Sequence, residues 1–336
     1  WNSEGDEIYF SSFAGGPYAL SVVSIGDLTV RRMPILSEWV RFPSLARDAA
    51  CLVYESRQEI QNIMMLSLGE LGASVIDAEP LIVSNVLDCE PSWSPDGAEF
   101  AFISTRSGHR ELWVCDSDGS RLRQLTALAG AYVACPIWSP DGRQLAIMVA
   151  GEEIGMYAID QLGGAPRRIT PANHNALPCS WSRDGDRVYY SCDVGGEWQI
   201  WQVRPDGVDA RQVTAGGGIS AIESPDGKTL YIVRPDQTGI WSRPLAGGSV
   251  ECVVPGLPAS HFQSWAVTTT GIYSVRPSDT TTMVMRYDSR SDETSEIAEI
   301  PSYPTSRFSI APDGESLLFV RSEHLDIDLK LLEYLH

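Results

Sequence analysis

Basic residues are scarce in this chain of 336 residues, which has 25 Lys and Arg against 44 Asp and Glu and a formal net charge of −19. A surface that binds nucleic acid neutralises phosphates with clustered cations, so this composition excludes nucleic-acid binding as the main role of the segment. Uninterrupted apolar runs are short as well, and none approaches the ~20 residues that a membrane-spanning helix needs. No signal peptide is recognisable and the chain begins with Trp1, so we expect that an upstream segment has been removed.

Several motifs that would carry chemistry are also missing. The seven cysteines include no Cys-x-x-Cys pair, which argues against zinc, and their odd number leaves at least one thiol unpaired. Gly-x-Ser-x-Gly, His-Glu-x-x-His and a phosphate-binding glycine loop before a helix are absent. The sequence therefore predicts no metal, no cofactor and no assignable catalytic residue. Cys89, Cys135 and Cys179 precede tryptophans in successive repeats; we interpret them as small buried hydrophobes, with a thiol-lined channel as the alternative.

What the sequence does contain is an internal repeat. Trp93-Ser94-Pro95-Asp96-Gly97 returns as Trp138-Ser139-Pro140-Asp141-Gly142, and further copies begin at Trp181, Ser224 and Ala311. The last positions of all eight copies, three weaker ones included, are 5, 49, 97, 142, 185, 227, 271 and 314. These spacings of 42 to 48 residues are typical of a propeller blade with four strands.

The residues of one copy fit a tight turn followed by a strand. Ser, Pro and Gly suit the first, second and fourth positions of a type I turn. The predicted turn residues are Asp96, Gly97, Asp141, Gly142, Asp184, Gly185, Asp226, Gly227, Asp313 and Gly314. Continuous apolar runs such as Phe100–Ile103 follow the turns, which indicates strands covered on both faces, as in a blade between two other blades.

The repeat predicts an all-β fold, a single β-propeller of four-stranded antiparallel blades over residues 1–336. Eight copies predict eight blades, with seven as the alternative. The first copy lacks its beginning and the last copy lacks its end, so we expect the ring to close by pairing of the N- and C-terminal strands. The expected blades are roughly 1–40, 41–88, 89–134, 135–178, 179–218, 219–263, 264–305 and 306–336.

The repeat resembles that of TolB-like propellers, the Pro-Asp-Gly variant of the tryptophan-aspartate repeat, over essentially the whole chain. Glu111–Ser120, Gly164–Thr170, Glu223–Lys228 and Asp326–Glu333 are further similar to propeller segments of bacterial CadC-like regulators. In those regulators a winged-helix DNA-binding domain and a membrane span come first. The resemblance implies a sensory or protein-docking module that is periplasmic or otherwise extracytoplasmic, with a cytoplasmic location as the alternative.

Polar loop residues suggest where such a module would bind. The connections between blades and the turns between the second and third strands of each blade emerge on one face of a propeller, and four of the five histidines map to them. Loops on a rigid scaffold commonly carry binding sites, although polar residues also gather in loops without any such role. The candidate ligand- or partner-binding residues are Arg106, His109, Arg110, His174, Asn175, Asp193, Trp198, Arg234, His261 and His324.

Together these features predict a non-enzymatic sensory or binding module, the extracytoplasmic part of a transmembrane transcriptional regulator or a docking protein. Its partner would be a protein or peptide, or a small ligand at the central funnel, and it would meet a membrane only through an upstream segment. One alternative is a propeller enzyme of the carbohydrate lyase or glycosidase type, for which Glu90 and Glu223 are the acids to test. Another is the gating propeller of a prolyl-oligopeptidase-like hydrolase whose catalytic domain is absent.

Overall fold

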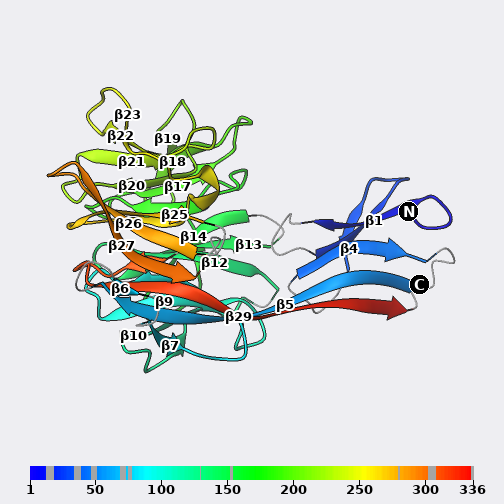
Figure 1. Ribbon diagram of the computed structural model, residues 1–336. Helices are drawn as coiled ribbons and strands as arrows, with labels where there is room; N and C mark the ends of the chain where they lie inside the picture. Colours follow the sequence, from blue (N-terminus) through cyan, green and yellow to red (C-terminus); the bar gives the residue numbers. More distant parts are fainter. Residues whose placement is uncertain are drawn as a thin grey trace. The chain divides into compact units, whose positions relative to one another are not determined.

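The structure is a computed structural model that describes residues 1–12, 19–33, 39–46, 51–68, 73–74, 78–128, 130–151, 154–278, 281–301 and 308–333. The described residues form β-strands almost throughout, with a 3-10 helix at Ala259–His261 (Figure 1). The all-β fold class and the antiparallel sheets expected from the repeat are therefore confirmed. Among the described residues, no helix is both long and apolar enough to cross a membrane.

The chain divides into two compact units. The larger unit comprises Gln61–Arg321, and the smaller unit comprises Trp1–Ile60 together with Ser322–His336. Two long strands, β5 (Cys51–Ser67) and β29 (Ser316–Glu333), contribute residues to both units.

Four sheets of the larger unit have four antiparallel strands each, in chain order. The first contains β8 (Asp88–Trp93), β9 (Glu99–Ser104), β10 (Glu111–Asp116) and β11 (Arg123–Gln124). The second contains β12 (Tyr132–Trp138), β13 (Gln144–Ala150), β14 (Ile154–Asp160) and β15 (Arg167–Arg168). The third contains β16 (Leu177–Trp181), β17 (Val188–Cys192), β18 (Gln199–Val203) and β19 (Arg211–Gln212). The fourth contains β20 (Ser220–Glu223), β21 (Thr229–Val233), β22 (Ile240–Pro244) and β23 (Glu251–Val254).

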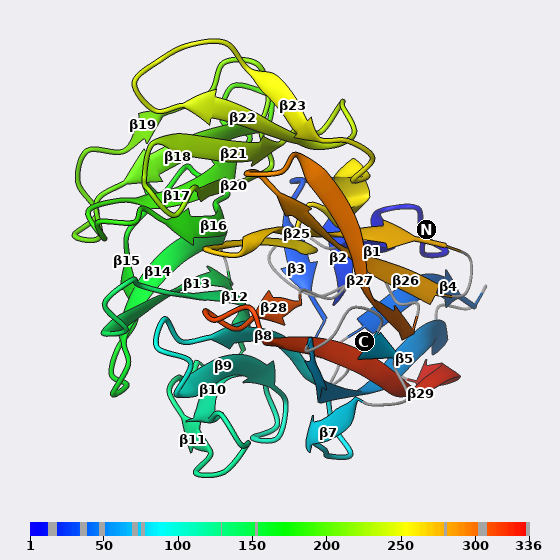
Figure 2. The same ribbon diagram turned by 60° about the vertical axis from the view of Figure 1, so that its left-hand side comes forward.

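Two further sheets of the larger unit draw on distant parts of the chain. The fifth contains β24 (Trp265–Thr268), β25 (Gly271–Pro277), β26 (Thr281–Asp288) and β27 (Glu293–Pro301), and β6 (Ala73–Ser74) pairs with β27 in parallel. The sixth contains β28 (Ser309–Ile310), the start of β29, the end of β5 and β7 (Glu79–Ile82). The first strands of the six sheets contact one another in the cyclic order β8, β12, β16, β20, β24, β28 and back to β8 (Figure 2).

The repeated turn has the same hydrogen bonds in several sheets. In Ser94–Gly97, the N–H of Gly97 donates to the carbonyl of Ser94 at 3.0 Å, and the Ser94 hydroxyl donates to Asp96 Oδ1 at 2.6 Å. The Ser94 hydroxyl also accepts the N–H of Glu99, the first residue of β9, at 3.0 Å. The same serine–aspartate bond recurs at Ser139, Ser182 and Ser224. Each turn is therefore stabilised within about six residues, by side chains that the repeat itself supplies.

The smaller unit contains β1 (Glu7–Ser12), β2 (Ala19–Ser24), β3 (Val30–Arg32) and β4 (Trp39–Leu45), together with its parts of β5 and β29. β1, β2 and β3 form a three-stranded antiparallel sheet, and β4 pairs with the start of β5. The side chains of Leu20 and Val22 from β2 are buried in one cluster with Val40, Leu52 and Tyr54 from β4 and β5. Two short sheets thus share a single small core.

The division into units differs from the expected single ring of eight blades over residues 1–336, and from its seven-bladed alternative. The described residues form seven hydrogen-bonded sheets, and the cycle of first strands contains six. The repeat copies at Trp1 and Ala46 fall in the smaller unit. The C-terminal strand β29 does pair with a strand from the N-terminal part of the chain, but that strand is β5, whereas β1 pairs with β2. β5 and β29 have 17 and 18 residues, and both contribute residues to the two units.

Candidate functional site

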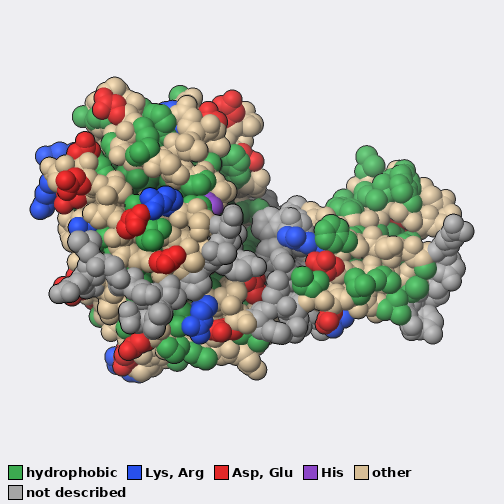
Figure 3. Space-filling view, in the orientation of Figure 1, with side chains coloured by type: hydrophobic (Ala, Val, Ile, Leu, Met, Phe, Trp, Pro, Cys, Tyr) green, Lys and Arg blue, Asp and Glu red, His purple; other side chains and the backbone are tan. Residues whose placement is uncertain are grey.

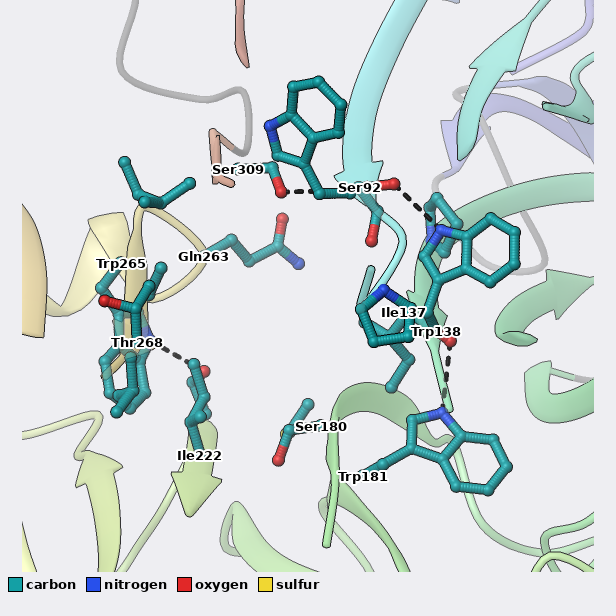
Figure 4. A pocket seen from close by; sticks show the side chains of 18 of the residues that line it. Ser92, Ile137, Trp138, Ser180, Trp181, Ile222, Gln263, Trp265, Thr268 and Ser309 are labelled. Carbon is teal, nitrogen blue, oxygen red and sulfur yellow. Dashed lines mark hydrogen bonds between the residues drawn. The ribbon is translucent and has the colours of Figure 1, made fainter. Parts of the chain in front are cut away.

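A cavity of about 510 Å³ lies in the larger unit, lined by its first strands (Figure 4). Each of the six first strands contributes to its wall, with Trp93, Trp138, Trp181, Ile222, Trp265 and Ile310. Prolines and serines supply much of the remaining wall, among them Pro91, Pro136, Ser92 and Ser180. Among the described residues that line the cavity, Arg183 alone is charged.

Tryptophan indoles join neighbouring sheets around this cavity. The Nε1–H of Trp138 donates to the main-chain carbonyl of Ser92 in β8 at 3.0 Å. The Nε1–H of Trp181 donates in the same way to the carbonyl of Ile137 in β12 at 3.2 Å (Figure 4). Because each bond crosses from one sheet to the next, the wall is held in place by its own side chains. This is a rigid setting of the kind that binding sites require.

Bulges re-aim the first strands where they enter the cavity wall. Glu90 and Cys135 have φ values of +54° and +58°, which are uncommon for residues other than glycine. Each precedes a proline, and the pairing register shifts at each of the two sites. As a result the Glu90 carboxylate accepts the N–H of Cys135 in the neighbouring sheet, and Gln263 donates to the Cys135 sulfur at 3.8 Å.

Arg110 is one of the residues expected to bind a partner, and the structure places it in a buried cluster. Its side chain is 5% exposed, forms a 3.0 Å ion pair with Glu90, and lies over the ring of Tyr132 at 4.4 Å. It also donates to the carbonyl of Val133 at 3.4 Å. Because a buried cation needs such partners, Arg110 connects β8 to β12 rather than presenting its charge to solvent.

Arg106 and Arg234 follow the second strands of their sheets and share an arrangement. The guanidinium of Arg106 lies 5.2 Å from the Trp113 ring, and that of Arg234 lies 5.1 Å from the Trp241 ring. Arg106 also forms a 2.8 Å ion pair with the fully buried Asp88. Both cations cover a tryptophan of the third strand, so packing accounts for much of their position.

The candidate histidines do not form one exposed set. His174 is buried, its Nδ1 lies 2.9 Å from the hydroxyl of Tyr190, and burial, with the nearby Arg168, lowers the pKa of its imidazole. His261 is also buried at the 3-10 helix, and burial lowers its pKa as well. His109 is exposed. His324 is expected in a turn but lies within β29, in the smaller unit, and its side chain is outside the described residues.

The remaining candidates lie at the surface of the third sheet. Asn175 is exposed, and Asp193 and Trp198 are half-buried at the two ends of the turn before β18. The nine candidates with described side chains therefore divide into buried or half-buried packing residues and separate surface positions. The cavity is lined by none of them.

Arg183 is the residue at this site that the sequence analysis missed. It stands where other copies of the repeat have proline, and that departure is the signal that could have revealed it. Its Nε and Nη2 donate at 3.3 Å to the carbonyls of Ser224, Glu223 and Val267, which belong to two neighbouring sheets. Desolvation lowers the pKa of its guanidinium, and the nearby Glu223 opposes that shift.

Glu223 itself is buried and doubly bonded. Its Oε2 accepts the main-chain N–H of Arg183 at 2.7 Å, and its Oε1 accepts the hydroxyl of Tyr189, also at 2.7 Å. Burial and this hydrogen bond raise the pKa of Tyr189. The carboxylate therefore holds the Arg183 turn against β20, which fixes the position of the arginine at the cavity.

A second cavity, of about 570 Å³, adjoins the same arginine. It lies among the repeat turns and is lined by Asp141, Arg143, Asp160, Arg183 and Asp184, with neighbouring polar residues. Arg183 therefore lines two cavities, one with a mixed polar and apolar wall and one with several charged residues. Among the described residues, His, Cys, Asp and Glu side chains form no group of three or more that could hold a metal ion.

Part of the chain is similar in sequence to known propeller proteins. Residues 128–266 match the family model described as the TolB beta propeller domain. The chain is 33% identical over 141 residues to a TolB homologue from Chlorobium luteolum, a match that covers 41% of this chain and 31% of that protein. The chain thus spans about a third of the length of this curated relative.

Solved structures agree on the fold. TolB from Acinetobacter baumannii is 13% identical with a TM-score of 0.56, over 90% of this chain and 80% of that one. A puromycin-hydrolyzing peptidase from Mycobacterium tuberculosis is 17% identical with a TM-score of 0.51, over 87% of this chain and 52% of that one. The chain is accordingly TolB-like, and its neighbours in fold include both TolB and a hydrolase.

Proposed function

We propose that this TolB-like propeller is a non-enzymatic binding module, and that the cavity at Arg183 receives a neutral or anionic segment of a protein or peptide partner. The observation that carries the proposal is the single positive charge in the lining of a cavity within a chain of net charge −19. The negative electrostatic potential of the chain repels acidic partners over most of the surface. A cation in the cavity therefore selects the place where a negative group can enter.

The rest of the wall suits a peptide. Tryptophan, proline and phenylalanine faces provide apolar contact, while serine hydroxyls and Gln263 provide hydrogen bonds. Two of the three nitrogens of the Arg183 guanidinium donate to carbonyls of the chain, and Nη1 donates to none of the described residues. A carboxylate, such as the end of a peptide chain, would accept a hydrogen bond from Nη1, so that all three guanidinium nitrogens donate.

The proposed cellular role is sensory or docking, in the extracytoplasmic part of a transmembrane transcriptional regulator or in a periplasmic docking protein. Support for a docking module comes from the match to the TolB beta propeller domain and from the TolB homologues. The regulator role is proposed from the sequence resemblance to CadC-like regulators. Partner binding at the cavity would then be the event that the module reports.

An enzyme is the alternative, since a peptidase is among the neighbours in fold. The two acids nominated for catalysis are both engaged: Glu90 bonds Arg110 and Cys135, and Glu223 bonds Tyr189 and Arg183. Carboxylates that are held in this way are poorly placed to exchange protons with a substrate. Turnover of an oligosaccharide that is lost in Glu90→Gln or Glu223→Gln would overturn the non-enzymatic proposal.

The binding proposal is tested with short synthetic peptides that have either a free or an amidated C-terminus. Their binding to the full chain is measured from the change in its tryptophan fluorescence. Free-acid peptides should bind, and Arg183→Met should weaken them by about tenfold, or ~1.4 kcal/mol. Arg183→Lys, which keeps the charge, should retain most of the binding. Arg143→Met, which removes an exposed cation of the second cavity, is the matched control. Equal binding by wild type and Arg183→Met, at equal melting temperatures, would remove the site.

A further inference from the structure

Exposed apolar side chains are concentrated on the smaller unit. Most of the large hydrophobic residues that are exposed in the described part of the chain belong to it: Trp1, Ile25, Leu28, Val30, Phe42, Ile327, Leu329 and Leu331. Figure 3 shows such side chains gathered on its surface. Contiguous exposed apolar surface is typical of a face that another molecule covers.

Three of these residues alternate along the C-terminal part of β29. Ile327, Leu329 and Leu331 are 53%, 79% and 55% exposed, whereas Leu332, on the opposite face, packs against the core of the unit. β5 lies on one side of β29, and β28 reaches only Leu317 and Leu318 on the other. Along Ile327–Leu331 the described residues therefore leave one edge of β29 open to pair with a further strand.

We propose that this edge pairs with the same edge of a second copy of the chain, antiparallel about a two-fold axis at Leu329. In that register Asp328 lies opposite Lys330 of the second copy, and Lys330 lies opposite its Asp328. Leu329 meets Leu329, and Ile327 meets Leu331. Opposite charges and apolar pairs directly across a ladder both stabilise it, so the segment is complementary to itself.

Neighbouring registers lack this property. An axis at Asp328 places two aspartates opposite each other, and an axis at Lys330 places two lysines opposite each other, which destabilises the pair. An axis at Leu331 sets Leu329 against Glu333. Lys330 on an edge strand also opposes strands without an acid at the matching position. Within one chain, Lys330 Nζ already lies 3.3 Å from Asp328 Oδ2, which is an ion pair. Pairing of two copies would bring two such ion pairs together.

The expected dimer is weak. The ladder is short, and two chains of net charge −19 repel each other. Association should therefore depend on protein concentration. It uses no residue of the cavity at Arg183, so it stands or falls independently of the proposed function.

The test is sedimentation equilibrium of the full chain over a range of concentrations. Wild type should show a monomer–dimer equilibrium, and Lys330→Asp and Asp328→Lys should each be monomeric. An equimolar mixture of these two variants should dimerise again, because Asp then faces Lys at both positions. The double variant Asp328→Lys/Lys330→Asp should also dimerise. Lys228→Asp, which removes an exposed lysine from a similar Asp–Lys pair in the larger unit, should leave association unchanged.

Three results would overturn the proposal. The first is a wild-type chain that stays monomeric throughout. The second is a dimer that survives both single charge reversals, because it must then use another surface. The third is a failure of the mixture to associate when wild type does, because the register would then be incorrect. All three substituted residues lie at exposed positions, and far-UV circular dichroism checks that each variant is folded.

Discussion

The indole N–H of Trp138 donates a 3.0 Å hydrogen bond to the main-chain carbonyl of Ser92, which lies in the neighbouring sheet. Trp181 bonds to Ile137 in the same way one sheet further on. A residue of the repeat thereby connects one sheet to the next, so the repeat specifies the junctions between sheets as well as the sheets themselves.

Trp138→Phe should lower stability because it leaves the Ser92 carbonyl without its donor. The expected loss is about 1 to 3 kcal/mol, measured as a shift in the urea midpoint by circular dichroism. Trp93→Phe is the matched control, since the Trp93 indole nitrogen is buried without a hydrogen-bond partner among the described residues. Its loss should be smaller. Equal shifts in the two variants would show that packing, and not the hydrogen bond, stabilises the junction.

Gly119→Ala should destabilise the chain more than Gly108→Ala. Both glycines have positive φ, +79° and +93°, so alanine at either site costs about 1 kcal/mol in backbone strain. A Cβ on Gly119 would also lie 2.8 Å from the main-chain oxygen of Leu81, whereas a Cβ on Gly108 meets nothing within 4 Å. The melting temperature of Gly119→Ala should therefore be the lower of the two, and the reverse order would contradict the close approach.

Acid should weaken the repeat turns through their aspartates. The hydroxyl of Ser139 and the N–H of Arg143 lower the pKa of Asp141, so the folded state holds its proton less tightly than the unfolded state. The stabilisation is present above the unfolded pKa of about 4 and disappears as pH falls through the folded pKa. Asp141→Asn should have a lower melting temperature than wild type at pH 7, and the difference should shrink toward pH 3. A constant difference would exclude the charge as its cause.

Mild acid should also act through His174. Because its pKa is lowered in the folded state, the unfolded chain takes up a proton first, and stability declines as pH falls below about 6.5. His174→Gln should melt at a lower temperature than wild type at pH 7.5 but lose less on transfer to pH 5. His261, also with a lowered pKa, should account for part of the remaining loss. His109→Gln, at an exposed turn, is the control for loss of a histidine. If it reduced the drop in melting temperature between pH 7.5 and pH 5 as much as His174→Gln does, the effect could not be assigned to His174.

The sheets of the larger unit could be anticipated because their signals are local. The turn at Ser94–Gly97 closes its hydrogen bonds within a few residues, and β9 follows it at once. The candidate site was harder to anticipate. Arg110 and His174 are polar residues near loops, yet their side chains turn into the protein to meet Glu90 and Tyr190. Spacing along the chain does not report which way a loop side chain points.

The amino-acid sequence alone determines the β-strands, their period and the turns that join them, since each depends on residues within one repeat. Tertiary structure decides how many repeats share one cycle of sheets, because β5 and β29 pair although most of the chain lies between them, and both contribute to the two compact units. It also decides that Arg183, in the place of a repeat proline, meets carbonyls from two other sheets beside a cavity. Contacts of that range depend on the whole packed chain, and no single repeat encodes them.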